Sequence, residues 1–164
     1  MNKRLSRGFK SSILCWLMIF LISAPYAAAQ EIVKVSFRLS RDGVRPGETF
    51  KAALLVNIAP GYHINGNELT DPYLLPTELV LEELEGFEVE EYVFPKPLSA
   101  RFEYAESEVA IYEGEIVIGI LIQAQKALGP GVQRLTGKLI YQACDSQTCL
   151  TPQELKLEIP VEVV

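Results

Sequence analysis

Several stretches of the chain alternate apolar and polar residues with a period of two. Residues 32–40, 49–58 and 153–163 all place apolar side chains at every second position. This pattern is typical of strands that bury one face, so each stretch is predicted to be a half-buried β-strand. Residues 115–123 are apolar on both faces, which predicts a central strand. Pro160 cannot donate a backbone hydrogen bond, so the last strand is predicted to lie at a sheet edge or to be bulged there.

Turn-forming residues divide the chain between these stretches. Residues 77–94 fit either one helix or two short strands, and Gly86 with the apolar and aromatic residues after it favours two strands. Neither an internal repeat nor an interdomain linker interrupts the pattern. About seven to nine short strands with regular turns predict an all-β fold, an antiparallel β-sandwich of the immunoglobulin-like type. The predicted turns cover residues 41–48, 59–67, 94–100 and 127–131.

The N-terminus has the pattern of a secretory signal peptide. Residues 1–10 are basic and free of acidic residues, an apolar run follows, and small residues then predict cleavage after Ala29. The apolar run is shorter than a usual membrane span, which disfavours an uncleaved anchor. Cys15 lies in the middle of this run and is interpreted as part of the signal, not as a lipid-attachment site. We therefore expect residues 1–29 to be removed, which leaves a secreted or periplasmic domain, residues 30–164, with no membrane anchor.

Removal of the signal peptide makes the chain more acidic. Four of the 15 basic residues and none of the 21 acidic ones lie in the signal, so the mature chain carries 11 basic against 21 acidic residues, a net charge near −10. Nucleic acids and anionic membranes both attract clustered Lys and Arg, so this balance argues against either as a partner. The remaining 135 residues are enough for one domain whose core does not need a disulfide merely to fold.

Two cysteines, Cys144 and Cys149, remain in the mature chain, in a compartment where disulfides form. The four residues between them fit a hairpin turn, which would bring the two Cβ atoms within bonding distance. Closing so small a loop stabilises a fold by about 2 kcal/mol or less, which favours a chemical role over a stapling role. Plain local disulfides with this spacing are nevertheless common in secreted domains. The spacing leaves both interpretations open.

Other chemistry for the cysteine pair is disfavoured. A zinc site would need two more ligands, and His63 is the only histidine in the chain. The pair also lacks the C-x-x-C spacing of a thioredoxin active site. Asp145 directly follows Cys144, and its negative charge disfavours a neighbouring thiolate, so a redox-active pair would have to be supported by the fold or by a docked partner. We expect neither a metal nor a cofactor.

The segment YQACDSQTCLTP, residues 141–152, resembles the active-site segment of the N-terminal periplasmic domain of DsbD-type thiol:disulfide interchange proteins, also called disulfide bond corrector domains. Three upstream segments, residues 57–65, 75–97 and 102–118, fall in the order of that family and at similar intervals. The resemblance therefore covers nearly all of residues 31–163.

This resemblance implies an immunoglobulin-like sandwich that relays electrons by thiol–disulfide exchange. Carried over by motif, Cys144 and Cys149 are the exchanging pair, and Cys149 forms the mixed disulfide. The implied partners are thioredoxin-fold redox proteins. Because the family's membrane segment and thioredoxin domain do not follow in this chain, we expect the electrons to come from a separate membrane or periplasmic reductant. We also expect a monomer.

The resemblance further implies which residues shape the site. The candidates are Phe102, Glu103 and Tyr104, in a segment that matches the family's cap loop, and Tyr62 and His63, in a segment that matches one beside the site. These residues also have simpler interpretations. Phe102 and Tyr104 could be loop aromatics packed on the sandwich, His63 a hydrogen-bonded turn residue, and Glu103 a solvated charge. The competing interpretation of the whole protein is a non-enzymatic secreted sandwich that binds another protein and has an inert local disulfide.

Overall fold

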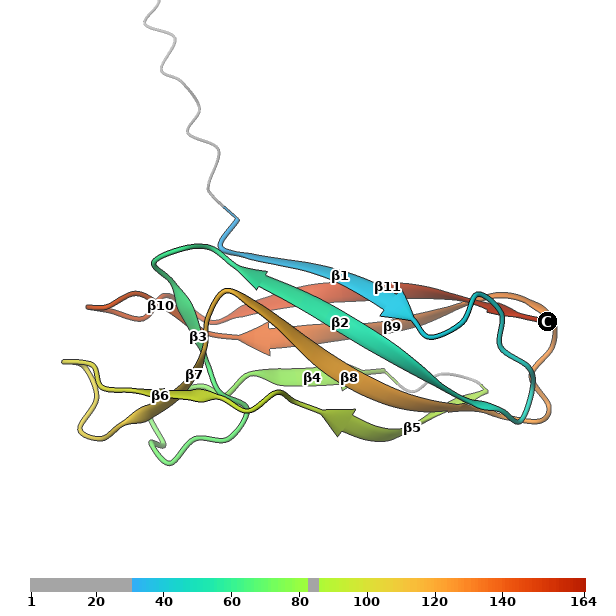
Figure 1. Cartoon of the computed structure of the whole chain (residues 1–164), viewed down its shortest axis with the longest axis horizontal. Coiled ribbons are helices and arrows are strands. Elements are labelled where there is room, and N and C mark those ends of the chain that lie inside the picture. Colours follow the sequence, from blue (N-terminus) through green and yellow to red (C-terminus); the bar gives the residue numbers. More distant parts are fainter. Residues whose placement is uncertain (1–30, 83–85) are drawn as a thin grey trace, which may run out of the picture.

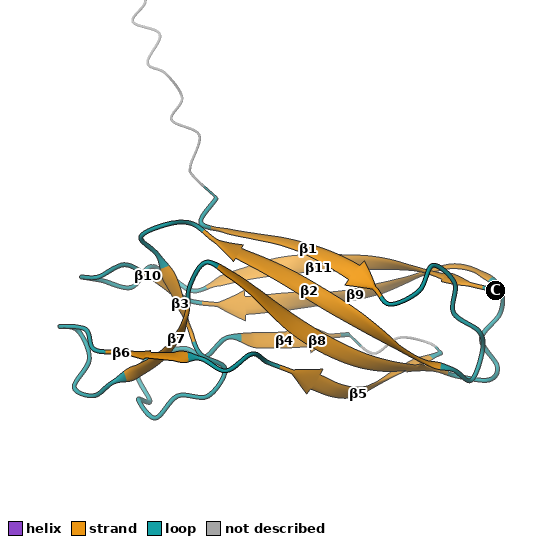
Figure 2. Cartoon of the chain, in the orientation of Figure 1, coloured by secondary structure: helices purple, strands orange, loops and turns teal. Residues whose placement is uncertain are grey.

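The described part of the chain is built from β-strands alone. The computed structural model describes residues 31–82 and 86–164, so the predicted signal peptide, with Cys15 and the cleavage site, lies outside the described residues. The described residues form eleven strands and no helix (Figure 2). Within these two ranges there is accordingly no helix long and apolar enough to span a membrane. The all-β fold predicted from the alternating pattern is confirmed.

The first sheet consists, in this order, of β1 (Val33–Leu39), β2 (Thr49–Ile58), β8 (Glu115–Ala124) and β5 (Phe87–Val93) (Figure 1). All of its neighbouring strands are antiparallel. β8 pairs with β2 on one side and with β5 on the other. The stretch that is apolar on both faces is therefore a central strand, as predicted.

The second sheet consists, in this order, of β11 (Gln153–Val163), β9 (Gly131–Tyr141) and β4 (Glu78–Leu81). β4 and β5 both come from residues 77–94, so this region forms two strands, the alternative that the sequence favours. β11 pairs with β9 along its whole length and is the edge strand of the sheet. Pro160 thus lies in an edge strand, as predicted, opposite Arg134.

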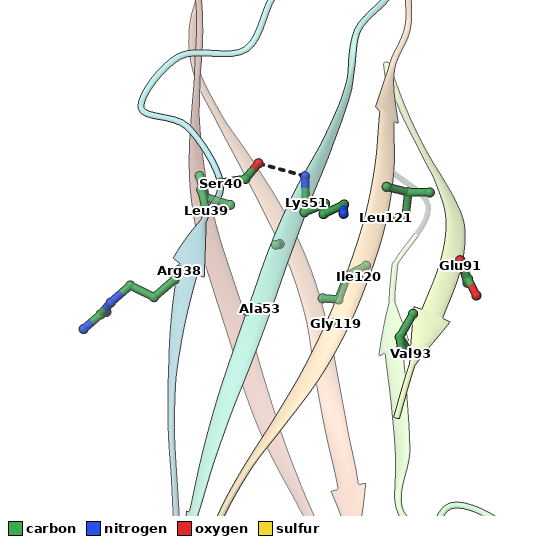
Figure 3. A pocket seen from close by; sticks show the side chains of 11 residues that line it. Arg38, Leu39, Ser40, Lys51, Ala53, Glu91, Val93, Gly119, Ile120 and Leu121 are labelled. Carbon is green, nitrogen blue, oxygen red and sulfur yellow. Dashed lines mark hydrogen bonds between the residues drawn. The ribbon is translucent and has the colours of Figure 1, made fainter. Parts of the chain in front are cut away.

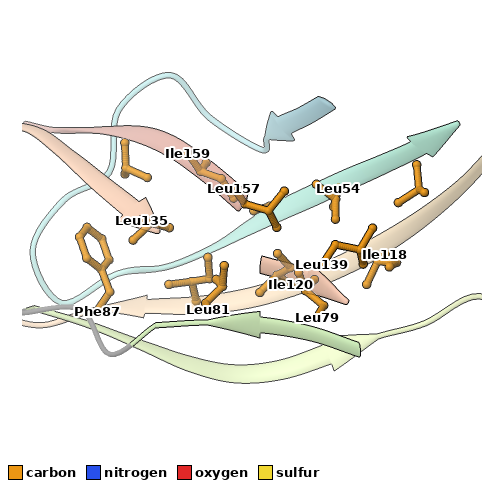
Figure 4. Close-up of a cluster of buried hydrophobic side chains, with 14 of the residues drawn as sticks. Leu54, Leu79, Leu81, Phe87, Ile118, Ile120, Leu135, Leu139, Leu157 and Ile159 are labelled. Carbon is orange, nitrogen blue, oxygen red and sulfur yellow. The ribbon is translucent and has the colours of Figure 1, made fainter. Parts of the chain in front are cut away.

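The two sheets enclose the apolar core between their inner faces (Figure 4). Leu54 of β2 and Ile118 of β8 are paired across the first sheet, while Leu139 of β9 and Ile159 of β11 come from the second. Each of the four is at most 1 % exposed. Burial of a side chain of this size contributes about 1.5–3 kcal/mol, so the alternating apolar positions supply the main stabilisation. The arrangement is the predicted immunoglobulin-like sandwich.

A third, smaller sheet extends the end of the sandwich opposite the C-terminus (Figure 1). It consists, in this order, of β10 (Ala143–Cys144), β3 (His63–Asn65), β7 (Val109–Tyr112) and β6 (Leu98–Ala100). β3 is buried at all three residues and pairs with β10 on one side and β7 on the other. The first cysteine of the pair is therefore part of this small sheet.

Two of the predicted turns contain short strands instead. The turn predicted over residues 59–67 contains β3, and the turn predicted over residues 94–100 contains β6. Three residues are too few to show alternation, and their Gly and Pro neighbours indicate a turn, whereas pairing with adjacent strands keeps these residues extended. The part of the chain that the structure describes also contains eleven strands, more than predicted, and four of them span ten or eleven residues.

The backbones of β9 and β4 approach each other closely at Gly137, which predicts a large effect of an added methyl group. A Cβ at Gly137 would lie 2.4 Å from Val80 O and 2.9 Å from Leu81 Cα, and these backbone atoms can yield only if a strand moves. We expect Gly137→Ala to lower the free energy of unfolding of the oxidised protein by about 2 kcal/mol or more, measured by urea denaturation. The matched control is Gly129→Ala, because a Cβ there meets nothing within 4 Å. The control should change stability by about 0.5 kcal/mol or less, and equal losses in both variants would contradict the packing argument.

Candidate functional site

Cys144 and Cys149 form a disulfide across a tight hairpin turn in the segment between β10 and β11, where the two residues also form an isolated antiparallel bridge. Cys144, the last residue of β10, is fully buried, whereas Cys149 is partly exposed. Inside the turn, Asp145 N donates a hydrogen bond to Thr148 O at 2.9 Å. The cysteines therefore flank a hairpin turn, as their spacing predicts.

The Asp145 carboxylate belongs to this turn. Its Oδ1 accepts hydrogen bonds from the backbone N–H groups of Gln147 and Thr148, both at 2.8 Å. These two bonds lower the pKa of Asp145, with a further contribution from nearby His63. The carboxylate is thus ionised at neutral pH and fixes the turn from within. The acidic residue beside Cys144 has a structural use that the sequence analysis does not foresee.

β3 places His63 next to the disulfide, because His63 and Cys144 lie opposite each other in the pairing of β3 with β10. The His63 imidazole stacks on the Phe102 ring at a centroid distance of 4.4 Å, and Phe102 stacks in turn on Tyr104 at 5.0 Å. The Tyr104 hydroxyl lies 2.8 Å from His63 Nε2, within hydrogen-bond distance. The loop between β6 and β7 is therefore fastened to the strand that adjoins the first cysteine.

The surroundings of this aromatic cluster favour uncharged side chains. Desolvation lowers the pKa of His63, while the negative charges of Glu113 and Asp145 oppose that shift without cancelling it. Desolvation, and then the charge of Asp145, raise the pKa of Tyr104 to about 12. At neutral pH, His63 and Tyr104 are thus a neutral hydrogen-bonded pair and not an ion pair.

Two predicted residues lie outside the aromatic cluster. Glu103 sits between Phe102 and Tyr104 in the chain and is exposed, a position that fits its simpler interpretation as a solvated charge. Tyr62 immediately precedes β3 and packs, partly buried, against the apolar core of the sandwich. The structure therefore brings together both cysteines, His63, Phe102 and Tyr104.

Gln142 is a residue of the site that the sequence analysis misses. Its side chain hydrogen-bonds both to the loop between β3 and β4 and to the residue that follows Cys149. Gln142 lies between the end of β9 and the start of β10, two positions before Cys144. An uncharged amide has no chemical signature that would select it from the sequence.

The described residues offer no alternative centre for metal chemistry. Within residues 31–82 and 86–164, no group of three or more His, Cys, Asp and Glu side chains could hold a metal ion.

A hollow of about 520 Å³ lies on the first sheet, around Ala53 and Gly119, and is lined by β1, β2, β8 and β5 (Figure 3). None of the predicted site residues lines this hollow, so it is separate from the disulfide.

The sequence model of the N-terminal domain of the thiol:disulfide interchange protein DsbD matches residues 29–160 of this chain. The chain belongs to this family. The match spans both the cysteine hairpin and the loop between β6 and β7, and it confirms the resemblance found in the cysteine segment. A comparison with curated proteins gave no match.

Solved structures of DsbD-type domains are similar in fold. The N-terminal periplasmic domain of ScsB from Proteus mirabilis is 17% identical with a TM-score of 0.53, and the alignment covers 79% of this chain and 46% of that chain. The reduced DsbD N-terminal domain from Neisseria meningitidis is 16% identical with a TM-score of 0.44, covering 78% and 85%. The complex of the DsbD and PilB N-terminal domains from the same organism gives 14% identity, a TM-score of 0.49 and coverage of 83% and 88%. At such identities the likeness concerns the fold alone, and the ScsB domain is the match that supports it.

The lowered pKa of His63 predicts how the stability of this DsbD-type domain depends on pH. The unfolded histidine takes up a proton near pH 6.5, whereas the folded one takes it up only at lower pH, so the unfolded chain binds more protons between these values. The stability that neutral His63 contributes is complete above about pH 6.5 and is lost as the pH falls below it. We expect the melting temperature of the oxidised protein to fall between about pH 7 and pH 5, and to fall less in His63→Gln, which keeps a neutral hydrogen-bonding side chain. Circular dichroism melts of both proteins test this, and parallel profiles would contradict it.

Proposed function

We propose that the domain exchanges electrons with thioredoxin-fold proteins through the pair Cys144 and Cys149. The chain belongs to a family of thiol:disulfide interchange domains, and these two residues form a disulfide. The observation that carries the proposal is their unequal exposure, because Cys144 is buried and Cys149 is partly exposed. An incoming thiolate therefore reaches the Cys149 sulfur, and Cys144 is the leaving group.

The proposed cycle moves two electrons and two protons. A thiolate of the reductant attacks Cys149 Sγ, the bond to Cys144 Sγ breaks, and Cys144 leaves with the electron pair and takes up a proton. A second thiol of the reductant then attacks the mixed disulfide, which leaves the reductant oxidised and the domain with two thiols. In the other half of the cycle, Cys149 attacks the disulfide of the client and Cys144 resolves the complex. The reductant is a separate membrane or periplasmic protein.

A thioredoxin-fold partner suits the surface beside Cys149. Active sites of that fold present one reactive thiol in an exposed position, which matches a single accessible sulfur on this domain. Leu150, the next residue along the chain, is 38 % exposed and provides an apolar contact beside the reacting sulfur. A small contact of this kind is typical of transient redox complexes.

We also propose that the loop between β6 and β7 is a cap over the site. Phe102 and Tyr104 hold the loop to His63 by stacking and by the contact between the Tyr104 hydroxyl and the imidazole. Each stacked pair is worth about 0.5–1.5 kcal/mol, so a docking protein can displace the loop at a modest cost. Glu103 is exposed on this loop, and Tyr62, next to β3, packs against the apolar core.

The proposed place of action is the periplasm. The signal pattern of residues 1–29 supports export and cleavage, which leaves the single domain of residues 30–164. The related ScsB domain from Proteus mirabilis is likewise periplasmic. In that compartment disulfides form and a separate reductant is needed to reduce them.

Substitution of Cys144 is expected to trap the partner. In Cys144→Ala no internal thiol can resolve the mixed disulfide, so a covalent complex with a thioredoxin-fold protein should accumulate through Cys149. The measurement is a reductant-sensitive band in periplasmic extracts, with both components identified by mass. The copy of this chain in that band should begin at or near Gln30.

Cys149→Ala is the matched control, since it also leaves one cysteine, and little complex should form with it. If Cys144→Ala captures no thioredoxin-fold protein, the relay is wrong and the inert-disulfide interpretation takes its place. If the partner is captured mainly through Cys144, the electron relay stands, but Cys144 is the attacking cysteine and Cys149 the resolving one. The reduction potential gives an independent check: roughly −180 to −270 mV for a relay, and below about −300 mV for a structural disulfide.

Removal of the aromatic contacts of the cap should expose the reduced thiols. We expect Phe102→Ala with Tyr104→Ala to speed alkylation of the reduced protein by a bulky maleimide at neutral pH, by roughly fivefold or more. The rate is followed by intact mass. Glu106→Ala, an exposed change in the same loop, is the control and should leave the rate unchanged. If the wild type, the double variant and Glu106→Ala are alkylated at equal rates, the loop does not act as a cap.

A further inference from the structure

The side chain of Gln142 connects two parts of the molecule that are distant in the sequence. Its Oε1 accepts hydrogen bonds from Leu75 N at 3.3 Å and from Asn65 Nδ2 at 3.4 Å. Its Nε2 donates to Leu150 O at 3.1 Å. The amide therefore spans from the small sheet and its adjoining loop to the residue that follows Cys149.

The hydrogen bonds of the Gln142 amide form a bridge, and the groups that donate to its Oε1 belong to the interior of the domain. Asn65 is fully buried, and its Nδ2 also donates to Leu75 O at 2.9 Å. Thr77 is 1 % exposed, and its hydroxyl donates to Asn65 O at 2.5 Å. These bonds fix β3 and the start of β4 relative to each other. The groups that donate to Gln142 Oε1 are therefore held in place by buried hydrogen bonds.

The donor side of the bridge acts on the cysteine hairpin. Leu150 is held twice, because its N–H donates to Ala143 O at 2.8 Å while its carbonyl accepts from Gln142. Thr148, on the other side of Cys149, is held by the turn through its carbonyl and its N–H. Cys149 thus lies between two residues that are tied to Ala143 and Asp145, the two neighbours of Cys144 in the chain. None of these hydrogen bonds involves a sulfur atom.

We propose that Gln142 is a positioning residue for the disulfide exchange. Through its hydrogen bond to Leu150 it keeps Cys149 close to Cys144 when the pair is reduced, and so raises the effective concentration of one thiol at the other. The inference rests on the proposed thiol–disulfide exchange and specifies how the fold sets the redox balance of that pair.

The reaction that measures this effect balances without a protein partner. The oxidised domain and two glutathione molecules give the dithiol domain and one glutathione disulfide. Its equilibrium constant reports the effective concentration of the two cysteine thiols. In the oxidised form the S–S bond holds the hairpin regardless of Gln142, whereas in the reduced form a loosened hairpin gains conformational freedom. Loss of the bridge therefore favours reduction and raises the reduction potential.

The test compares two substitutions of Gln142 with a matched control. Gln142→Met keeps the shape and removes both kinds of hydrogen bond. Gln142→Glu keeps the acceptor oxygen for Leu75 and Asn65 and removes the donor to Leu150. The control is Gln153→Met, because Gln153 Nε2 also donates to a backbone carbonyl of the same segment, that of Thr151, at 3.3 Å.

Both Gln142 variants are expected to lower the effective concentration about tenfold in full-chain protein equilibrated with glutathione, a rise of about 30 mV in potential. The control should match the wild type. A merely structural role would weaken the oxidised and reduced forms equally, lowering both melting temperatures and leaving the potential unchanged. An unchanged potential in Gln142→Glu, or in Gln142→Met if the Glu variant does not fold, overturns the inference.

The outcome is separable from that of the proposed function. The glutathione equilibrium involves no thioredoxin-fold protein, so a failure to trap a partner through Cys149 leaves its result interpretable. Conversely, an unchanged potential in the Gln142 variants leaves the trapping result standing.

Discussion

The pairing of β3 with β10 is the contact on which the site depends. It is two residue pairs long, Ile64 with Ala143 and His63 with Cys144. It nevertheless joins the segment that follows β2 to the segment that precedes β11. Because β3 also pairs with β7, the same strand brings in the hairpin of β6 and β7 with its aromatic loop. Three segments that are distant in the sequence thus meet at the first cysteine through one buried strand of three residues.

The disulfide joins a fully buried cysteine to a partly exposed one. Cys144 is buried but is absent from the core cluster, whereas its neighbour Ala143 is part of that cluster. The main packing contacts between the two large sheets therefore come from apolar side chains other than the cysteines. A ring this small adds about 2 kcal/mol or less to stability. On the proposed function, the domain must keep its fold while the bond opens and closes, a condition that a disulfide in a small local loop meets more easily than one between distant core segments.

The long strands are predictable from the sequence because each contains enough residues to show its period. β2, β8 and β11 each span ten or eleven residues, and Pro160 marks the edge of the sheet. The site is less predictable because its contacts join distant positions. His63 and Tyr104 are 41 positions apart, and Asn65 and Gln142 are 77 positions apart, so no local spacing signals either contact. The family resemblance indicates which loop approaches the cysteines, but the stacking geometry and the role of an amide depend on the packing of the folded chain.

On the proposed function, the turn between the cysteines must keep its shape when the disulfide is open, and the acidic residue beside Cys144 contributes to that shape. The turn is fixed by the Asp145 carboxylate, which accepts from two backbone N–H groups, and by a backbone bond between Asp145 and Thr148. None of these hydrogen bonds involves a sulfur atom. The carboxylate reaches across the turn to the N–H of Thr148, the residue before Cys149, and so ties together the two ends of the turn. On the proposed function, this carboxylate therefore helps to preserve the turn in the reduced state, while the unequal exposure of the two cysteines leaves the attacking role to Cys149.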